Sequence, residues 1–126
     1  MESIRLETNL RNVDGRQVLD VKGEVDVYTA PQFKEAVNKM VDSGEKHILI
    51  DMSGVRYMDS SGFGTLLSVM KRLKPNGGSI NLINVSSPID RILKITRLNQ
   101  VFATYPSVDE AIRATQESGS SAEKLS

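Results

Sequence analysis

The sequence predicts an α/β fold, with a mixed sheet of four to five strands and about four helices. Two strand patterns come first, and short apolar strands then alternate with amphipathic helices. This order is typical of parallel strands joined by right-handed helical crossovers. The chain has 126 residues, enough for one domain with a single core. From Gln116 the chain is serine-rich and polar, so we expect one domain over 1–115 and a disordered tail over 116–126.

The first two strands are expected to pair as a hairpin. Ile4 and Leu6 alternate with polar residues, as in a half-buried strand. An Asp-Gly pair at positions 14 and 15 is a strong hairpin turn signal. The second strand is predicted over Val18–Lys22, with Gly23 ending it.

A helix is predicted to follow, with Thr29 as its N-cap. Pro31 lies in the first turn, where its missing N–H costs nothing, and Gln32 would complete a capping box with Thr29. Gly44 is expected to end the helix. Its apolar stripe is formed by Ala30, Phe33, Val37, Met40 and Val41.

The next unit is a short buried strand over 47–51 and a helix that ends near the Pro-Asn-Gly-Gly run at 75–78. The apolar stripe of that helix is predicted to contain Phe63, Leu66, Leu67, Met70 and Leu73.

Two smaller units complete the expected fold. A strand is predicted over Ser79–Val85, followed by a helix capped by Ser87 and Pro88. A short strand over Val101–Ala103 then precedes a last helix capped by Ser107.

Composition excludes several classes of function. Sixteen basic residues balance sixteen acidic ones, so no electrostatic footprint for nucleic acid or an anionic membrane is expected. There is no cysteine, which excludes disulfides and thiolate metal sites, and His47 is the one histidine. No apolar run reaches the roughly 20 residues of a membrane span, and the N-terminal residues lack an apolar signal-peptide core. We therefore expect a soluble cytoplasmic protein.

The segment Asp59-Ser60-Ser61-Gly62 lies at the predicted start of the second helix. Asp and Ser are ordinary N-cap residues, so an ordinary cap is one interpretation. The first helical N–H groups are unpaired and the helix dipole favours negative charge, so a phosphate on Ser60 would be tolerated here. The second interpretation is therefore a phosphorylation switch.

Three segments of the chain stand out together. Residues 23–31 read Gly-Glu-Val-Asp-Val-Tyr-Thr-Ala-Pro, and residues 57–64 read Tyr-Met-Asp-Ser-Ser-Gly-Phe-Gly. The third segment joins Gly-Gly-Ser at 77–79 with the run at 91–98. In this order they resemble the anti-sigma factor antagonists of bacteria, the founding members of the STAS domain family, and residues 57–64 are similar to the family's phosphorylation motif. The resemblance covers about residues 4–113.

The resemblance implies that a partner anti-sigma factor with serine kinase activity phosphorylates Ser60. It also implies that a PP2C-like phosphatase restores the serine. The unphosphorylated form would bind the anti-sigma factor and release the sigma factor. Because parallel sheets place their sites at the carboxyl ends of strands, we expect the loop at 24–31 and the start of the helix that carries Phe63 to contact the partner. These residues are Asp26, Tyr28, Thr29, Asp59, Ser61, Gly62, Phe63 and Gly64.

Other functions fit the sequence less well. Glu24, Asp26 and Asp59 could form a carboxylate cluster for metal or acid–base chemistry, but no nucleophile–base pair and no P-loop accompany them. We expect no enzyme activity, catalytic residue, metal or cofactor, and a nucleotide-binding protein is the less favoured interpretation. A STAS domain could also serve a stressosome-like scaffold or a lipid-transport complex.

The two glycines around Phe63 suggest close approach by a backbone. Gly62 and Gly64 each cost up to about 1 kcal/mol relative to Ala near a helix start. The approaching backbone could belong to the partner, or the helix could pack tightly on its own sheet.

Overall fold

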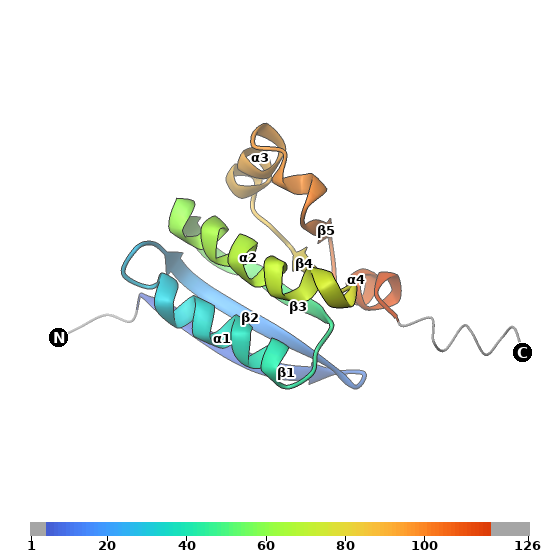
Figure 1. Cartoon of the computed structure of the whole chain (residues 1–126). Helices are drawn as coiled ribbons and strands as arrows, with labels where there is room; N and C mark the ends of the chain where they lie inside the picture. The colour runs from blue at the N-terminus through green and yellow to red at the C-terminus, as the bar shows by residue number, and fades with distance from the viewer. Residues whose placement is uncertain (1–4, 117–126) are drawn as a thin grey trace, which may run out of the picture.

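The computed structural model describes residues 5–116, and its five strands form one mixed sheet in the order β1-β2-β3-β4-β5 (Figure 1). Strand β1 pairs antiparallel with β2, and each later pair of neighbours is parallel. This confirms the predicted mixed sheet with parallel later strands. The strands are β1 (Leu6–Val13), β2 (Arg16–Val25), β3 (His47–Met58), β4 (Ser79–Ile83) and β5 (Ala103–Tyr105).

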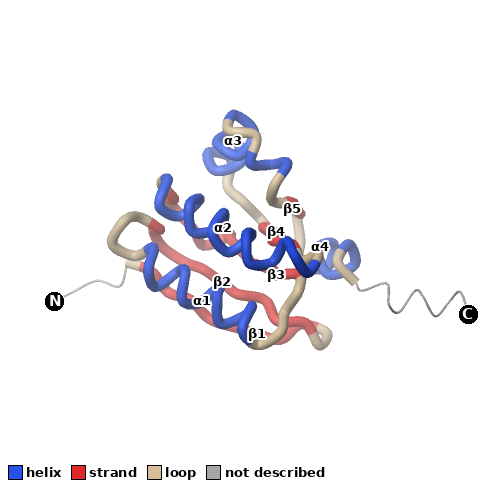
Figure 2. Tube along the Cα trace, in the orientation of Figure 1, coloured by secondary structure: helices blue, strands red, loops and turns tan. Residues whose placement is uncertain are grey.

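Four α-helices connect and cover the strands, as expected (Figure 2). They are α1 (Ala30–Asp42), α2 (Ser60–Leu73), α3 (Ser87–Ile95) and α4 (Val108–Ala114). Helices α1 and α2 lie side by side over one face of the sheet (Figure 1). None of the four is long and apolar enough to cross a membrane.

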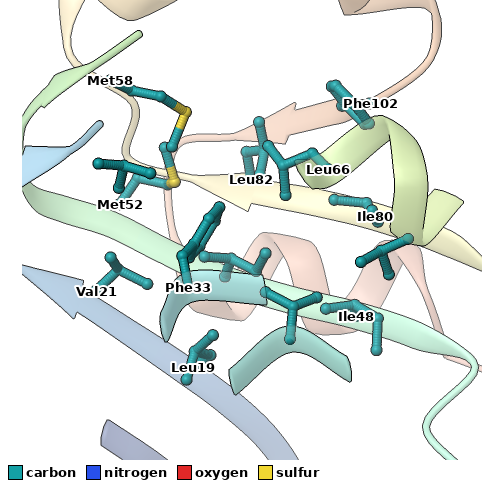
Figure 3. Packing of buried hydrophobic residues seen from close by; sticks show 14 of the residues in the cluster. Leu19, Val21, Phe33, Ile48, Met52, Met58, Leu66, Ile80, Leu82 and Phe102 are labelled. Carbon is teal, nitrogen blue, oxygen red and sulfur yellow. The ribbon is translucent and has the colours of Figure 1, made fainter. Parts of the chain in front are cut away.

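The main core lies between the sheet and the helices α1, α2 and α3 (Figure 3). Phe33 of α1, Leu66 of α2 and Phe102 are fully buried against the central strands. On the opposite face, α4 covers a smaller cluster formed by Val18, Leu49, Ile83, Ala111 and Ile112. Because the first half of β3 is covered on both faces, it reads as a continuous apolar run.

Two strands are longer than the sequence predicts. Gly23 does not end β2, which continues to Val25, and β3 runs to Met58 instead of ending at position 51. Gly23 has φ +112°, and a Cβ there would lie 2.1 Å from the carbonyl oxygen of Arg5. The glycine is therefore a point of close contact with the chain entering β1, not a terminator.

The start of α1 differs from the predicted capping box. The Thr29 hydroxyl makes no cap hydrogen bond. It accepts from the Asp26 N–H at 2.9 Å and donates to the Glu24 carbonyl at 2.8 Å. The Gln32 amide donates to the Leu6 carbonyl at 3.2 Å. Both side chains thus hold α1 to the sheet instead of closing its first turn.

The last elements differ from their predicted bounds by one or two residues. Strand β4 ends at Ile83, and β5 begins at Ala103 where the short strand was expected to end. The N-cap of α3 is Ser86, not Ser87, since its hydroxyl accepts from the Ile89 N–H at 3.4 Å.

Two helix ends agree with the sequence. The predicted cap Ser107 is confirmed by its hydrogen bond from the Glu110 N–H at 3.1 Å. Gly44, with φ +99°, follows the end of α1 as expected. Ile4 and the tail after Gln116 lie outside the described residues.

Candidate functional site

The site begins at the junction of β3 and α2. Asp59 is the N-cap of α2, in extended conformation, and its carboxylate accepts from the Ser61 N–H at 2.8 Å. Ser60 is the first residue of the helix and is exposed, whereas Ser61 is half-buried. The Ser60 hydroxyl thus faces solvent at the positive end of the helix dipole, where added negative charge is favourable.

Gly62 and Phe63 lie on the buried side of α2. Phe63 is 7% exposed and belongs to the main core. A Cβ on Gly62 would lie 2.5 Å from Cγ of Met58 and 2.9 Å from Cγ1 of Val25. Gly62 therefore lets the first turn of α2 pack onto the ends of β2 and β3, which is the second of the two explanations considered above.

Gly64 differs from Gly62. It is exposed, and a Cβ built there would meet no heavy atom within 4 Å. Packing within the described chain does not require glycine at this position. The smooth backbone surface that Gly64 leaves is available to another molecule.

The loop after β2 lies directly beside the start of α2. The Asp59 N–H donates to the Val25 carbonyl at 3.0 Å, and Val25 pairs with Met58 at the ends of the parallel strands. The β2–α1 loop and the first turn of α2 therefore occupy the same end of the molecule (Figure 1). The structure thus brings together two loops that lie far apart in the sequence.

The conformation of the loop is fixed by Asp26. Its Oδ1 accepts from the Tyr28 N–H at 2.9 Å and from the Thr29 N–H at 3.1 Å, and its Oδ2 pairs with the Arg5 guanidinium. Desolvation acts to raise the pKa of Asp26, but these N–H donors and the charge of Arg5 lower it below its ordinary value. Asp26 is therefore a structural acceptor, while Thr29 is 8% exposed and also faces inward.

Apolar side chains stand out around this junction. Tyr28 is 79% exposed, and its ring lies 5.8 Å from the Arg5 guanidinium carbon. Val27 beside it and Tyr57 near the end of β3 are 62% and 52% exposed. Exposed apolar side chains are typical of protein–protein contact surfaces, so this end of the molecule is a candidate contact surface.

The outer face of α2 also carries exposed residues. Leu67 was expected in the buried stripe of the helix, but it is 37% exposed. Counting four and seven residues on from Ser60 reaches Gly64 and Leu67, so all three share one helix face. We call the combined area the switch surface, which consists of Asp26, Val27, Tyr28, Tyr57, Ser60, Gly64 and Leu67.

Sequence reasoning missed Val27, Tyr57, Leu67 and Arg5. The spacing from Ser60 could have found Leu67. No sequence signal separates Val27 and Tyr57 from core residues, because their exposure depends on where β2 and β3 end.

The carboxylates near the site are paired with arginine side chains or with backbone N–H groups. Glu24 lies 3.5 Å from Arg5 and 3.7 Å from Arg56, and Asp26 is paired with Arg5. Across residues 5–116 there is no group of three or more metal-ligating side chains. Glu24 and Asp26 thus share the Arg5 guanidinium, and the Asp59 carboxylate accepts from the Ser61 N–H.

Comparison with known proteins agrees with this geometry. The STAS domain model matches residues 7–111. The anti-sigma-B factor antagonist of Staphylococcus aureus (strain NCTC 8325 / PS 47) is 36% identical over 81 residues, which cover 64% of this chain and 75% of that protein. The anti-sigma-B factor antagonist of Staphylococcus epidermidis is 31% identical over 98 residues, covering 76% of this chain and 91% of the relative.

Among solved structures, an anti-sigma factor antagonist from Mycobacterium paratuberculosis is similar throughout. The TM-score is 0.79 at 28% identity, with 89% of this chain and 95% of that chain covered. The sequence resemblance and the predicted fold are thereby confirmed. The chain belongs to the STAS domain family.

Proposed function

We propose that the protein is an anti-sigma factor antagonist whose binding to an anti-sigma factor is switched off by phosphorylation of Ser60. The observation that carries the proposal is the position of Ser60. Its exposed side chain stands at the first residue of α2, at the end of the molecule where Val27, Tyr28 and Tyr57 are also exposed. The similarity to proteins named anti-sigma-B factor antagonists supports the same role.

Ser60 is the better phosphate acceptor of the two serines. Ser61 is half-buried, and its backbone N–H is held by the Asp59 carboxylate. Ser60 is exposed and can enter the active site of a kinase without unwinding α2. In this proposal the kinase is the anti-sigma factor itself, and a PP2C-like phosphatase removes the phosphate.

Phosphorylation would change the surface and leave the fold intact. Phosphoserine adds about −1.5 to −2 charges at neutral pH, and the positive end of the helix dipole at the start of α2 favours negative charge there. Asp59 next to it carries like charge and already caps the helix, so it would repel the phosphate. In a complex, the dianion would be buried against a partner that covers Tyr28, Tyr57 and Leu67, which is costly for an unpaired charge.

The protein acts here by binding, not by turnover. The partner would cover the switch surface, with Asp59, Ser61, Gly62, Phe63 and Thr29 supporting it from beneath. A protein that acts on sigma factor availability works in the cytoplasm, and the proposal requires no metal, cofactor, nucleic acid or membrane.

The test compares variants of Ser60 in binding to the anti-sigma factor by titration calorimetry. Ser60→Asp should weaken binding about 100-fold or more, the effect of roughly 3 kcal/mol for an unpaired buried charge. Ser60→Ala should bind like the wild type and resist inactivation by the kinase. Ser61→Ala is the matched control and should remain switchable. Wild-type affinity for a folded Ser60→Asp variant would contradict the proposal.

A further inference from the structure

The two edges of the sheet are protected unequally. Strand β5 has three residues and is followed directly by Pro106, and both features discourage pairing with another strand. Strand β1 at the other edge has eight residues and contains neither Pro nor Lys (Figure 1). Within residues 5–116, β1 is thus the long edge that lacks these safeguards against pairing.

The backbone of β1 presents a regular set of unpaired groups. The Glu24 N–H donates to the Arg5 carbonyl at 2.8 Å, so the odd-numbered residues of β1 bond to β2. The N–H and C=O groups of the even-numbered residues then point away from the sheet. The Leu6 carbonyl agrees with this alternation, since it accepts from the Gln32 side chain. Thr8, Leu10 and Asn12 carry the remaining outward groups.

Side chains beside this edge fit an incoming strand. Leu10 is 45% exposed, although it lies on the same face as the buried Leu6. Between β1 and α1 runs a groove lined by Thr8, Asn9, Leu10, Leu19, Gln32, Glu35, Ala36 and Lys39. A strand added at β1 would cover Leu10 and place its own side chains along this groove.

The charged side chains on the opposite face of β1 favour a second copy of the chain as the added strand, and they favour one register of the pairing. In antiparallel pairing of β1 with the β1 of a second copy, a two-fold axis at Asn9 sets Glu7 opposite Arg11 of the second copy. Centring the axis on Glu7 or Arg11 would oppose like charges, and centring it on Thr8 or Leu10 leaves Glu7 without a cationic partner.

Pairing of the two β1 strands about Asn9 would also extend an existing row of alternating positive and negative side chains. Glu7 already stands opposite Lys22 of β2, and Arg11 is bonded to Asp20 at 2.8 Å. The pairing would therefore alternate Lys22, Glu7, Arg11 and Asp20 across the two copies. It would also form backbone hydrogen bonds between Thr8 and Leu10 in both directions, because these are the outward-facing residues.

We propose that the protein forms a two-fold symmetric homodimer through antiparallel pairing of β1 with β1, centred on Asn9. The two five-stranded sheets would join into one continuous sheet. The inference rests on β1 and is independent of the proposed role of Ser60.

Sedimentation equilibrium of the full chain tests the proposal, at concentrations up to about 1 mM so that weak association is seen. The wild type should dimerise. Leu10→Pro removes an outward N–H and leaves the β1–β2 ladder intact, so it should be a folded monomer. Glu7→Lys should weaken the dimer at least about 10-fold, because the introduced ammonium group would face Arg11 of the second copy. Glu45→Lys makes the same change of charge outside β1 and should dimerise like the wild type.

A wild type that stays monomeric throughout this range would overturn the proposal. So would a dimer that survives in Leu10→Pro with the affinity of the wild type. Circular dichroism of each variant shows whether it is folded, and Glu7→Lys keeps the test decisive if Leu10→Pro does not fold. Equal dimerisation of Glu7→Lys and Glu45→Lys would refute the register.

Discussion

The residues at the start of α2 are of two kinds: some pack on the sheet, and others are exposed on the outer face of the helix. Gly62 is required by packing against Met58 and Val25, whereas a Cβ added at Gly64 would meet no heavy atom within 4 Å. Ser60 and Gly64 lie on the outer face, and Phe63 lies on the inner one. The segment 59–64 therefore contains residues that the packing of the fold requires and residues that it does not require.

Replacing each glycine by alanine tests this division. Gly62→Ala should destabilise the fold by about 1–3 kcal/mol, because its methyl group overlaps Met58 and Val25. Gly64→Ala should stabilise it by up to about 1 kcal/mol, since a helical glycine is replaced without a clash. Urea denaturation of both variants measures the two changes. If Gly62→Ala were as stable as Gly64→Ala, the account of packing at the start of α2 would be wrong.

Individual residues were predicted unevenly from the sequence. The helix start at Asp59 and Ser60 is predicted correctly, because helix starts carry strong local signals in the residue types themselves. The exposure of Val27 and Tyr57 was not found, since apolar residue type alone does not tell which side of a strand end faces solvent.

At the scale of elements, the conformation of the β2–α1 loop depends on one charged residue, Asp26. Asp26 holds Tyr28 and Thr29 through their backbone N–H groups and is paired with Arg5. Strand β2 extends past Gly23 to carry this loop to Asp59. The sequence located the loop but ended the strand too early, because the glycine serves a long-range contact with Arg5 that local pattern does not reveal.

The dependence on Asp26 predicts a pH effect on stability. Burial raises the pKa of Asp26, but the N–H donors and Arg5 lower it by more, so the folded value lies below the unfolded one. Its stabilising effect is then fully present above the unfolded pKa of about 3.9 and is lost as pH falls through the folded value.

Asp26→Asn keeps an oxygen acceptor but loses the charge that pairs with Arg5. The Tm of this variant should lie below that of the wild type at pH 7, and the gap should narrow below about pH 4. Thermal melts followed by circular dichroism across this range give the comparison. A gap that stays constant down to the lowest pH would show that the charge of Asp26 does not act as described.

For the whole molecule, the alternation of strands and helices was enough to predict the mixed sheet with parallel later strands. The sequence could not supply the distance between the β2–α1 loop and the junction of β3 and α2. That distance follows from Val25 pairing with Met58, which requires both strands to run longer than their apolar patterns indicate. The fold thus assembles the switch surface from segments about thirty residues apart.

The central claim is that phosphate on Ser60 controls binding while the fold is kept. The most direct measurement treats the protein with its anti-sigma factor kinase and ATP, maps the phosphate by peptide mass spectrometry and titrates the same sample against the partner. We predict phosphate on Ser60, an unchanged circular dichroism spectrum and affinity reduced about 100-fold or more. Phosphate mainly on Ser61, or full affinity with Ser60 phosphorylated, would contradict the account.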